Sequence, residues 1–238
     1  MGLPLQANQY SERQNDSMPN SRTTTANCLS IVLCFYGLKA DRVPMICNGV
    51  DLGKCCPKEQ YQLSEPAVLL HIGRFNEQKN HKGLLEAFAE IVKVHPDCCL
   101  KLIGDGSLEE ETKAYAKTLG IGDKTLFLGN QTDIYSFLQE AEIFLLPSRF
   151  EGMPMTIIEA MGTGLPIVAS AVGGVPDMLE DRVSGILVPC DPESVTQAVL
   201  QLLQQEDLRK TLGTNALRSS EKFGAEHMSK CYFEVYSN

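Results

Sequence analysis

The sequence predicts an α/β protein in which a parallel β-sheet carries helices on both of its faces. Three observations lead to this fold class. Short apolar runs alternate with longer amphipathic or charged segments from about residue 68 onward, the connections between them are short, and Gly, Pro or Asp marks many of their ends. Strands that alternate with helices in this way pair in parallel and are buried on both faces.

The first two strand–helix units are recognised as apolar runs that are each followed by a longer segment. Residues 68–73 are apolar enough for a buried strand, and a polar loop separates them from an amphipathic helix at 84–94. Residues 100–103 form the next strand. The charged segment 108–119 follows it and is expected to be a helix.

The middle of the chain supplies two further strands. Residues 125–128 are the third strand, and the short helix after it ends at Glu140, with Asp133 as its expected N-terminal cap. The fourth strand, 143–146, is a fully apolar run that ends at Pro147.

The last third of the chain completes the sheet. Residues 166–170 form the fifth strand, and the glycine-containing segment 172–177 is expected to be a flexible loop. Residues 185–188 form a short sixth strand. Asp191 then begins a helix that has Pro192 near its first turn, and two or three helices finish the chain.

Two glutamates, Glu151 and Glu159, are separated by seven residues just after the fourth strand. Pro154 fits the first turn of a helix, which leaves Glu151 on a Gly-containing loop and places Glu159 on the second turn. The N-terminus of such a helix offers backbone N–H groups and positive potential to a phosphate. The candidate donors are the N–H groups of Met153, Met155 and Thr156. Carboxylates beside a phosphate suit the hydroxyls of a sugar attached to it.

Two basic residues upstream complete a candidate diphosphate site. Arg74 stands at the C-terminal end of the first strand, where open parallel sheets bind ligands, and Lys79 follows in the loop or first helical turn. An Arg fork and a Lys point charge together suit a diphosphate. Gly173 and Gly174, which follow the fifth strand, are expected to let the backbone come close to a phosphate.

Each of these residues also has a purely structural interpretation. Either glutamate could be a solvated acid, and Glu159 could stabilise the N-terminus of its own helix. Arg74 could pair with Asp105 at the neighbouring strand end. His71 lies within an apolar strand and is expected to be a hydrogen-bonded core residue. The joint presence of two acids and two cations favours a binding site over these interpretations.

Three motifs together resemble one enzyme family: Gly73-Arg74-x4-Lys79, Glu151-x7-Glu159 and Gly164-x-Pro166. They resemble the retaining glycosyltransferases of family 4, and in particular the C-terminal, donor-binding half of their GT-B fold. The likeness covers about residues 44–236 and includes residues 48–51, where such enzymes pass from the first domain to the second. It implies that the parallel sheet is Rossmann-like.

The resemblance implies a role for each matching residue. Arg74 and Lys79 bind the donor diphosphate, and Glu159 binds the ribose hydroxyls. Glu151 contacts the transferred sugar, so that Arg74, Lys79 and Glu151 are the residues expected to act in catalysis. The rest of the implied donor site consists of Leu128 and Asn130 at the nucleobase, and of Gly73, Gly152, Met153, Met155 and Thr156.

The same resemblance implies the chemistry. The donor is a nucleotide sugar, commonly a UDP-sugar, and transfer retains the anomeric configuration. The acceptor is a sugar or a lipid-linked molecule that the sequence does not identify, in polysaccharide, glycolipid or glycoconjugate synthesis. We expect no cofactor and no metal ion, and the chain contains no Asp-x-Asp that could hold a divalent cation against a diphosphate.

Composition argues against several other classes of protein. The 238 residues carry 21 Lys and Arg against 30 Asp and Glu, a net charge of −9, which disfavours nucleic acid as a partner. No apolar stretch approaches the roughly 18–20 residues that span a bilayer, and the polar start does not resemble a signal peptide. Nine cysteines, an odd number without zinc-type spacing, favour reduced thiols. We therefore expect a cytoplasmic protein, or one that is peripheral at the inner face of the membrane.

Four segments are expected along the chain. Residues 1–25 are polar and expected to be disordered. Residues 26–50 resemble the remnant of an N-terminal acceptor domain with its linker, 51–224 form the nucleotide-sugar-binding domain, and 225–238 form a C-terminal crossover helix. Because most of an acceptor domain is missing from the sequence, the activity of this chain alone stays open. An N-terminal-half partner chain or self-association is expected to complete it.

Two rival functions stay open: a non-catalytic nucleotide-sugar-binding fragment, and a nucleotide-sugar epimerase-like protein on a similar scaffold. A dinucleotide-dependent oxidoreductase is disfavoured, because the segment 104–109 has only the first two glycines of the fingerprint and follows the second strand. A P-loop NTPase is excluded, because no G-x4-G-K-[ST] segment is present.

Overall fold

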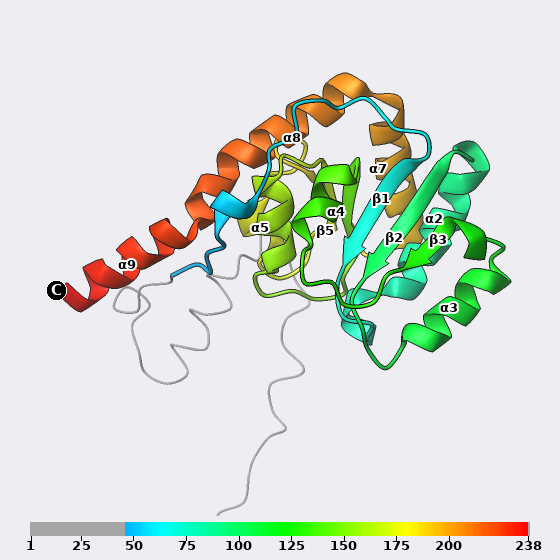
Figure 1. Cartoon of the computed structure of the whole chain (residues 1–238), viewed down its shortest axis with the longest axis horizontal. Coiled ribbons are helices and arrows are strands. Elements are labelled where there is room, and N and C mark those ends of the chain that lie inside the picture. Colours follow the sequence, from blue (N-terminus) through cyan, green and yellow to red (C-terminus); the bar gives the residue numbers. More distant parts are fainter. Residues whose placement is uncertain (1–45, 238) are drawn as a thin grey trace, which may run out of the picture.

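Six parallel strands form the centre of the molecule (Figure 1). The computed structural model describes residues 46–237. The strands are β1 (Ala67–Ile72), β2 (Cys98–Ile103), β3 (Thr125–Phe127), β4 (Ile143–Leu146), β5 (Ile167–Ser170) and β6 (Ile186–Val188). The six predicted strands are confirmed, each within two residues of its expected ends.

The strand order β3-β2-β1-β4-β5-β6 determines where a ligand site can lie. The chain builds the sheet outward from β1 to β3, then returns to the opposite side of β1 and continues from β4 to β6. The C-terminal ends of β1 and β4 therefore flank the topological switch point, at which open α/β sheets bind ligands. The predicted basic and acidic residues follow these two strands.

The predicted helices are also present. Among the described residues they are α2 (His81–Val94), α3 (Glu109–Thr118), α4 (Tyr135–Glu140), α5 (Met155–Gly162), α6 (Val175–Met178), α7 (Pro192–Gln204), α8 (Glu206–Ser220) and α9 (Ala225–Ser237). Short 3₁₀ turns lie between them: η2 (Leu52–Lys54), η3 (Glu77–Lys79), η4 (Gly122–Lys124) and η5 (Glu221–Phe223). The helix expected at 84–94 begins three residues earlier, directly after η3.

An aspartate lies at the start of two helices, and one of them, Asp191, is the N-cap residue as predicted. The Asp191 carboxylate accepts a hydrogen bond from the Ser194 N–H at 2.8 Å, and Pro192 is the first residue of α7. The N-cap residue of α4 is Ile134 rather than the expected Asp133, although the Asp133 carboxylate accepts a hydrogen bond from the Tyr135 N–H at 3.0 Å. Both bonds satisfy N–H groups that a helix leaves without an internal partner.

The prediction of a flexible loop at 172–177 is wrong for its second half, because helix α6 begins at Val175. Gly174 is the N-cap residue, and Pro176 lies in the first turn, where its fixed φ suits a helix. Val175 and Met178 are buried in the core. Proline stiffness and buried side chains outweigh the flexibility that two neighbouring glycines suggest.

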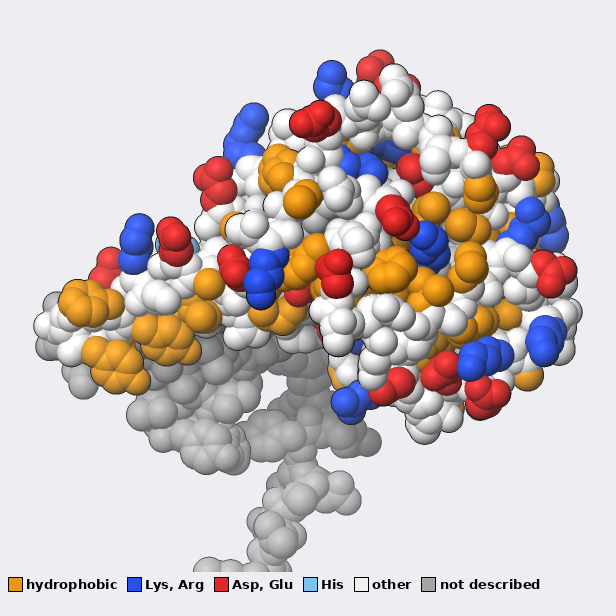
Figure 2. All heavy atoms as spheres, viewed as in Figure 1, with side chains coloured by type: hydrophobic (Ala, Val, Ile, Leu, Met, Phe, Trp, Pro, Cys, Tyr) orange, Lys and Arg blue, Asp and Glu red, His pale blue; other side chains and the backbone are white. Residues whose placement is uncertain are grey.

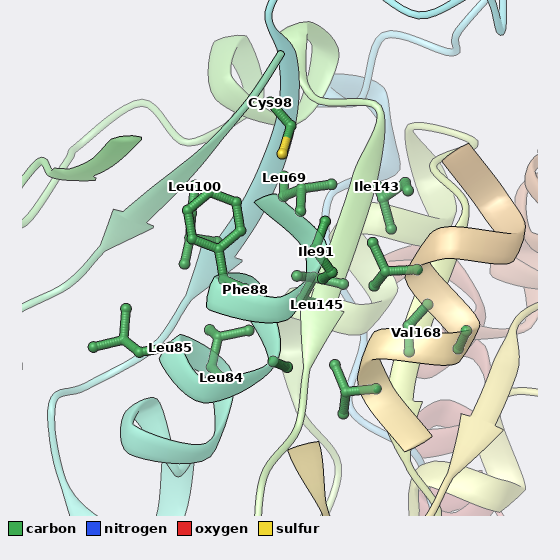
Figure 3. Close-up of a cluster of buried hydrophobic side chains, with 14 of the residues drawn as sticks. Leu69, Leu84, Leu85, Phe88, Ile91, Cys98, Leu100, Ile143, Leu145 and Val168 are labelled. Carbon is green, nitrogen blue, oxygen red and sulfur yellow. The ribbon is translucent and has the colours of Figure 1, made fainter. Parts of the chain in front are cut away.

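Two hydrophobic layers enclose the sheet. Helices α2, α3 and α7 cover one face, where Phe88 of α2 lies among buried side chains such as Leu69 and Leu100 (Figure 3). Helices α4, α5 and α6 cover the other face, and α8 contributes Leu212 to the first layer and Ala216 to the second. Burying one such Leu or Phe contributes about 1.5–3 kcal/mol. The layers therefore hold β1 and β4 firmly below the switch point.

The C-terminal helix α9 projects from the sheet domain and has no buried residue (Figure 1). Its exposed apolar side chains form a cluster on the projecting arm in Figure 2; they are Tyr232, Phe233, Val235 and Tyr236. At the base of α9, backbone hydrogen bonds of 3.0 and 2.8 Å join Val50 to Phe223 and Ala225. The described start of the chain is thus attached where α9 begins.

The predictions for the beginning of the chain fall mostly outside the described residues. The structure does not describe residues 1–45. These residues include all of the segment expected at 1–25 and most of the one expected at 26–50. Within residues 46–237, no helix combines the length and the apolar character needed to cross a membrane.

Candidate functional site

An ion pair lies at the switch point between β1 and β4. Lys79, in η3 after β1, places its Nζ 2.6 Å from Oε1 of Glu151, in the loop after β4. Their side chains are only 15% and 5% exposed, so water screens the pair weakly. Two of the three residues expected to act in catalysis therefore meet, although 72 positions separate them in the sequence.

Local hydrogen bonds fix the loop that carries Lys79. The Asn76 side chain accepts a bond from the Lys79 N–H at 3.1 Å and so caps η3. The Gln78 carbonyl accepts one from the Arg149 N–H at 2.8 Å, which ties this loop to the one after β4. The backbone therefore sets the direction from which Lys79 approaches the crevice.

Gln78 is a site residue that the sequence analysis missed. Its Nε2 donates to the Phe150 carbonyl at 3.0 Å and approaches Oε2 of Glu151 at 3.4 Å. Glu151 is thus held by Lys79 on one oxygen and by Gln78 on the other. No motif or spacing points to Gln78, and only its place next to Lys79 could have suggested it.

The loop after β5 closes on the backbone of Glu151. Gly173 has φ +54°, and a Cβ on it would lie 1.7 Å from the Glu151 carbonyl oxygen. The same oxygen accepts a bond from the Gly174 N–H at 3.2 Å. The glycines were expected to admit a phosphate; the close neighbour in the described structure is the peptide of Glu151.

Arg74 has an exposed guanidinium that makes no hydrogen bond or ion pair with any residue of 46–237. Asp105, its alternative partner, instead accepts a hydrogen bond from the side-chain amide of Asn130. The structural interpretation of Arg74 is therefore not supported, and its guanidinium is available to a ligand.

The N-terminus of α5 lies directly after Glu151. Pro154 is the N-cap residue, one position earlier than expected, so Met155 and Thr156 begin the helix with N–H groups that have no helical acceptor. The side chain of Met153 is engaged in packing, because its sulfur accepts a bond from the Asn48 N–H at 3.1 Å. Gly152 is exposed, and a Cβ on it would meet no atom within 4 Å.

Glu159 lies on the second turn of α5, as predicted, and is partly buried. Its carboxylate forms no hydrogen bond or ion pair within the described part of the chain, and burial raises its pKa. Its negative charge reaches Cys55 and Tyr135, whose pKa values are raised first by burial and then by Glu159. Within residues 46–237, no hydrogen bond or ion pair joins Glu159 to the Lys79–Glu151 pair.

Leu128 and Asn130 follow β3, at the edge of the sheet. The Leu128 N–H bonds to the Leu102 carbonyl at 2.9 Å, and Asn130 is exposed apart from its bond to Asp105. Three strand spacings of about 4.8 Å separate β3 from β4, or roughly 14 Å. The structure therefore does not bring these residues into contact with Glu151, and only an extended ligand would span them.

Two further features of this region bear on ligand binding. A pocket of about 320 Å³ opens between η3 and α3, and its lining includes His81, Tyr115 and Arg149 but neither Lys79 nor Glu151. Residues 46–237 contain no group of three or more His, Cys, Asp or Glu that could hold a metal ion. Metal independence stays an expectation.

Two buried histidines lie beneath the Lys79 loop. His71 on β1 and His81 at the start of α2 meet edge to face, with ring centroids 4.8 Å apart. Burial, together with a smaller effect of the Lys79 charge, lowers the pKa of His71 to about 4 and that of His81 to about 2. The sequence predicts that His71 is hydrogen-bonded, and this holds for one of its two nitrogens. Nδ1 lies 2.8 Å from the Leu145 carbonyl oxygen, whereas Nε2 has no hydrogen-bond partner among the described residues.

We expect the free energy of unfolding to fall as the pH drops from about 6.5 towards 4. The unfolded chain then takes up protons that the buried imidazoles do not, and a pKa of about 4 for His71 corresponds to roughly 3 kcal/mol over this window. Urea unfolding at several pH values measures the slope. His71→Asn should flatten it and the exposed His227→Asn should not; an unchanged slope in His71→Asn would contradict the assignment.

Comparisons with known proteins agree with this geometry. A family model described as "Glycosyl transferases group 1" matches residues 57–219. N-acetyl-alpha-D-glucosaminyl L-malate synthase of Bacillus anthracis is 33% identical over 182 residues, which are 75% of this chain and 48% of the relative. The chain spans about half the length of the curated relatives it matches.

Solved structures show the same fold. HepE of Anabaena in complex with UDP and glucose superposes with a TM-score of 0.78 at 22% identity, over 90% of this chain and 62% of that one. The C-terminal domain of a glycosyl transferase group 1 family protein from Francisella tularensis gives a TM-score of 0.67 at 23% identity, over 74% of this chain and 100% of that one.

Proposed function

The chain belongs to the glycosyl transferases group 1 family, and we propose that it supplies the donor-binding half of a retaining glycosyltransferase. In this proposal the donor is a nucleotide sugar, with UDP as the first nucleotide to test. The observation that carries it is the buried Lys79–Glu151 pair beside the free guanidinium of Arg74, at the switch point of the sheet.

The diphosphate would lie between Arg74, Lys79 and the N-terminus of α5. Arg74 has no competing partner among the described residues, and Lys79 is held in place by the capped η3 turn. The N–H groups of Met155 and Thr156 add positive potential from the helix. These groups would stabilise the negative charge that develops on the diphosphate as it leaves the sugar.

Glu151 would accept hydrogen bonds from the hydroxyls of the transferred sugar. In the donor-free chain its charge is balanced by Lys79 at 2.6 Å. A bound diphosphate would attract the same ammonium, which frees one carboxylate oxygen of Glu151 for the sugar while Gln78 steadies the other. The ion pair thus keeps both groups at the site until a ligand replaces part of it.

The nucleoside would lie along the crevice towards β3. Glu159, a partly buried carboxylate without a partner in residues 46–237, would bind the ribose hydroxyls. The loop that carries Leu128 and Asn130 would meet the base. A carboxylate that is buried without a partner is unfavourable in the free protein, which supports a ligand role for Glu159.

The wider context is also part of the proposal. Residues 51–224 would form the donor domain and α9 a separate C-terminal helix, and the acceptor would be positioned by protein outside this domain, in a partner chain or a second copy. The acceptor would be a sugar or lipid-linked molecule in cytoplasmic polysaccharide, glycolipid or glycoconjugate synthesis. Transfer would need neither a metal ion nor a cofactor.

A thermal-shift titration with UDP, ADP and GDP tests the proposal. A ligand at 100 times its dissociation constant adds about 2.7 kcal/mol, or roughly 5–10 °C in the melting temperature of a domain of this size. Arg74→Ala should weaken binding of the preferred nucleotide about 10- to 100-fold, the scale of a charge-assisted hydrogen bond. Arg218→Ala, an exposed arginine on α8, is the matched control.

Absence of a shift with every nucleotide, or unchanged binding by Arg74→Ala, would contradict the proposal. Product analysis with a UDP-sugar then separates the remaining functions. Transfer gives a new glycoside, epimerisation gives an isomeric donor, and a binding module gives neither.

Glu159→Gln is expected to have opposite effects on stability and binding. The free chain should melt at a higher temperature near pH 7, because burial raises the pKa of Glu159 and a neutral amide avoids the burial of a charge. UDP should bind about 10-fold less tightly, because ribose hydroxyls lose a charged acceptor. Calorimetry with UDP and with a ligand that lacks the ribose hydroxyls measures the difference; equal losses for both ligands would exclude the ribose role.

A further inference from the structure

His71 occupies the point at which β1 and β4 stop pairing. The ladder between the two strands pairs Leu69 with Ile143 and Leu70 with Phe144 and goes no further, whereas β1 and β2 stay paired through Ile72. The residue after the last β1–β4 pair is His71, which is fully buried. The strands that carry the Lys79 and Glu151 loops therefore separate at this histidine.

The imidazole of His71 bridges the two strands at this point. Its Nδ1 lies 2.8 Å from the carbonyl oxygen of Leu145, the β4 residue after the last pair. A carbonyl can only accept, so Nδ1 carries the proton. In the neutral ring Nε2 is then a lone-pair acceptor, and it is buried without a hydrogen-bond partner among the described residues.

Nε2 of His71 and the side chain of Lys79 both lie next to Gly73. A Cβ placed on Gly73 would be 3.0 Å from His71 Nε2, and 3.1 and 3.2 Å from Cδ and Cε of Lys79. The lysine stem and the imidazole nitrogen thus approach the same point, and a side chain at position 73 would crowd both of them by a few tenths of an ångström.

A neutral ring is the form that suits this place. A protonated imidazole would repel the ammonium of Lys79, and burial already keeps the pKa of His71 near 4. His81 packs edge to face on the same ring and stacks on Phe75, with centroids 4.1 Å apart. His71 is therefore held rigidly, with its acceptor nitrogen below the lysine.

We propose that His71 is a positioning residue of the donor site: bonded to β4 through Nδ1, it supports the Lys79 side chain through Nε2 and keeps the ammonium between Glu151 and a bound diphosphate. The proposal rests on the proposed function, because it assumes that Lys79 contacts the diphosphate. An ammonium has three N–H donors, and Glu151 uses one. A phosphate oxygen and His71 Nε2 can take the others.

Two substitutions separate support of Lys79 from a merely structural role. An Asn side chain at position 71 can still donate to the Leu145 carbonyl but ends short of Nε2, whereas a Gln side chain can place its carbonyl oxygen near Nε2 and loses the bond to β4. We expect His71→Asn to weaken UDP binding about 5- to 10-fold and His71→Gln to retain most of the affinity. A purely structural histidine would give the reverse order, and that order would overturn the proposal.

A double-mutant cycle with Lys79→Met provides the second readout. His71→Asn should weaken UDP binding in the presence of Lys79 but by less than 2-fold in the Lys79→Met background. Equal losses in both backgrounds would overturn the proposal. If His71→Asn does not fold, the cycle is run with His71→Leu, which removes both nitrogens and should show the same dependence on Lys79.

Side-chain nitrogen NMR of the wild-type chain provides a third readout. The spectrum should show a neutral His71 with the proton on Nδ1, and UDP should shift its Nε2 resonance unless Lys79 is replaced. A proton on Nε2, or no shift with bound UDP, would overturn the proposal. Failure of the wild type to bind any nucleotide would instead overturn the proposed function, so the two failures are distinguishable.

Discussion

Replacing Gly173 with alanine is expected to destabilise the protein by about 3 kcal/mol or more and to disturb the donor site. A left-handed backbone costs a residue with a Cβ about 1–2 kcal/mol, and φ is +54° here. The new Cβ would also lie 1.7 Å from the Glu151 carbonyl oxygen, so the backbone must move, and overpacking of this kind costs about 1–3 kcal/mol. Glu151 would be displaced with its peptide, so UDP-sugar binding should weaken as well.

Gly120→Ala is the matched control for this prediction. Gly120 also has a positive φ, +72°, but a Cβ there would meet no atom within 4 Å. Only the cost of the left-handed backbone applies, so the free energy of unfolding should fall by about 1–2 kcal/mol. Urea unfolding measures both variants. Equal losses in the two variants would show that the contact between Gly173 and Glu151 carries no energy.

Replacing Lys79 with methionine should reduce both stability and nucleotide affinity. The Glu151 side chain is only 5% exposed and would keep only the 3.4 Å approach of Gln78. Breaking a fully buried pair costs about 3–5 kcal/mol, and because Lys79 is partly exposed we expect about 2 kcal/mol. UDP should bind about 10- to 100-fold less tightly, because the diphosphate loses a cation.

Lys101→Met is the matched control, because Lys101 pairs at 2.8 Å with Glu140, whose side chain is 60% exposed and stays solvated when the lysine is lost. It should cost less than about 1 kcal/mol and leave UDP binding unchanged. The double variant Lys79→Met/Glu151→Gln should recover much of the lost stability, because no buried charge is left unpaired, but not the affinity. If Lys79→Met binds UDP as the wild type does, the diphosphate role of Lys79 is wrong.

The fold could be predicted because its signals are local. Strands such as β4 are continuous apolar runs, and starts of helices such as α7 carry an aspartate and a proline at positions that can be recognised from neighbouring residues alone. The one wrong element, the second half of 172–177, failed where burial of Val175 and Met178 outweighs the local signal of two glycines.

The site was predicted in part for the same reason. Arg74, Lys79, Glu151 and Glu159 stand in recognisable motifs after strand ends, so the sequence identified them as candidates. It could not choose between a ligand and Asp105 as the partner of Arg74. Side-chain contacts decided this point: β1 and β2 are neighbours, yet the Asp105 carboxylate bonds to Asn130 rather than to Arg74.

By itself, the sequence of this protein determined the alternating α/β architecture, the family, and the residue types offered to a donor. Only the tertiary structure decided which of these groups touch. It also added to the site Gln78, the contact of Gly173 with Glu151, and His71 with its one unbonded nitrogen. The physical reason is that periodicity and capping report on residues a few positions apart. The pairing of β1 with β4 joins segments more than seventy residues apart, and it depends on how the whole sheet packs.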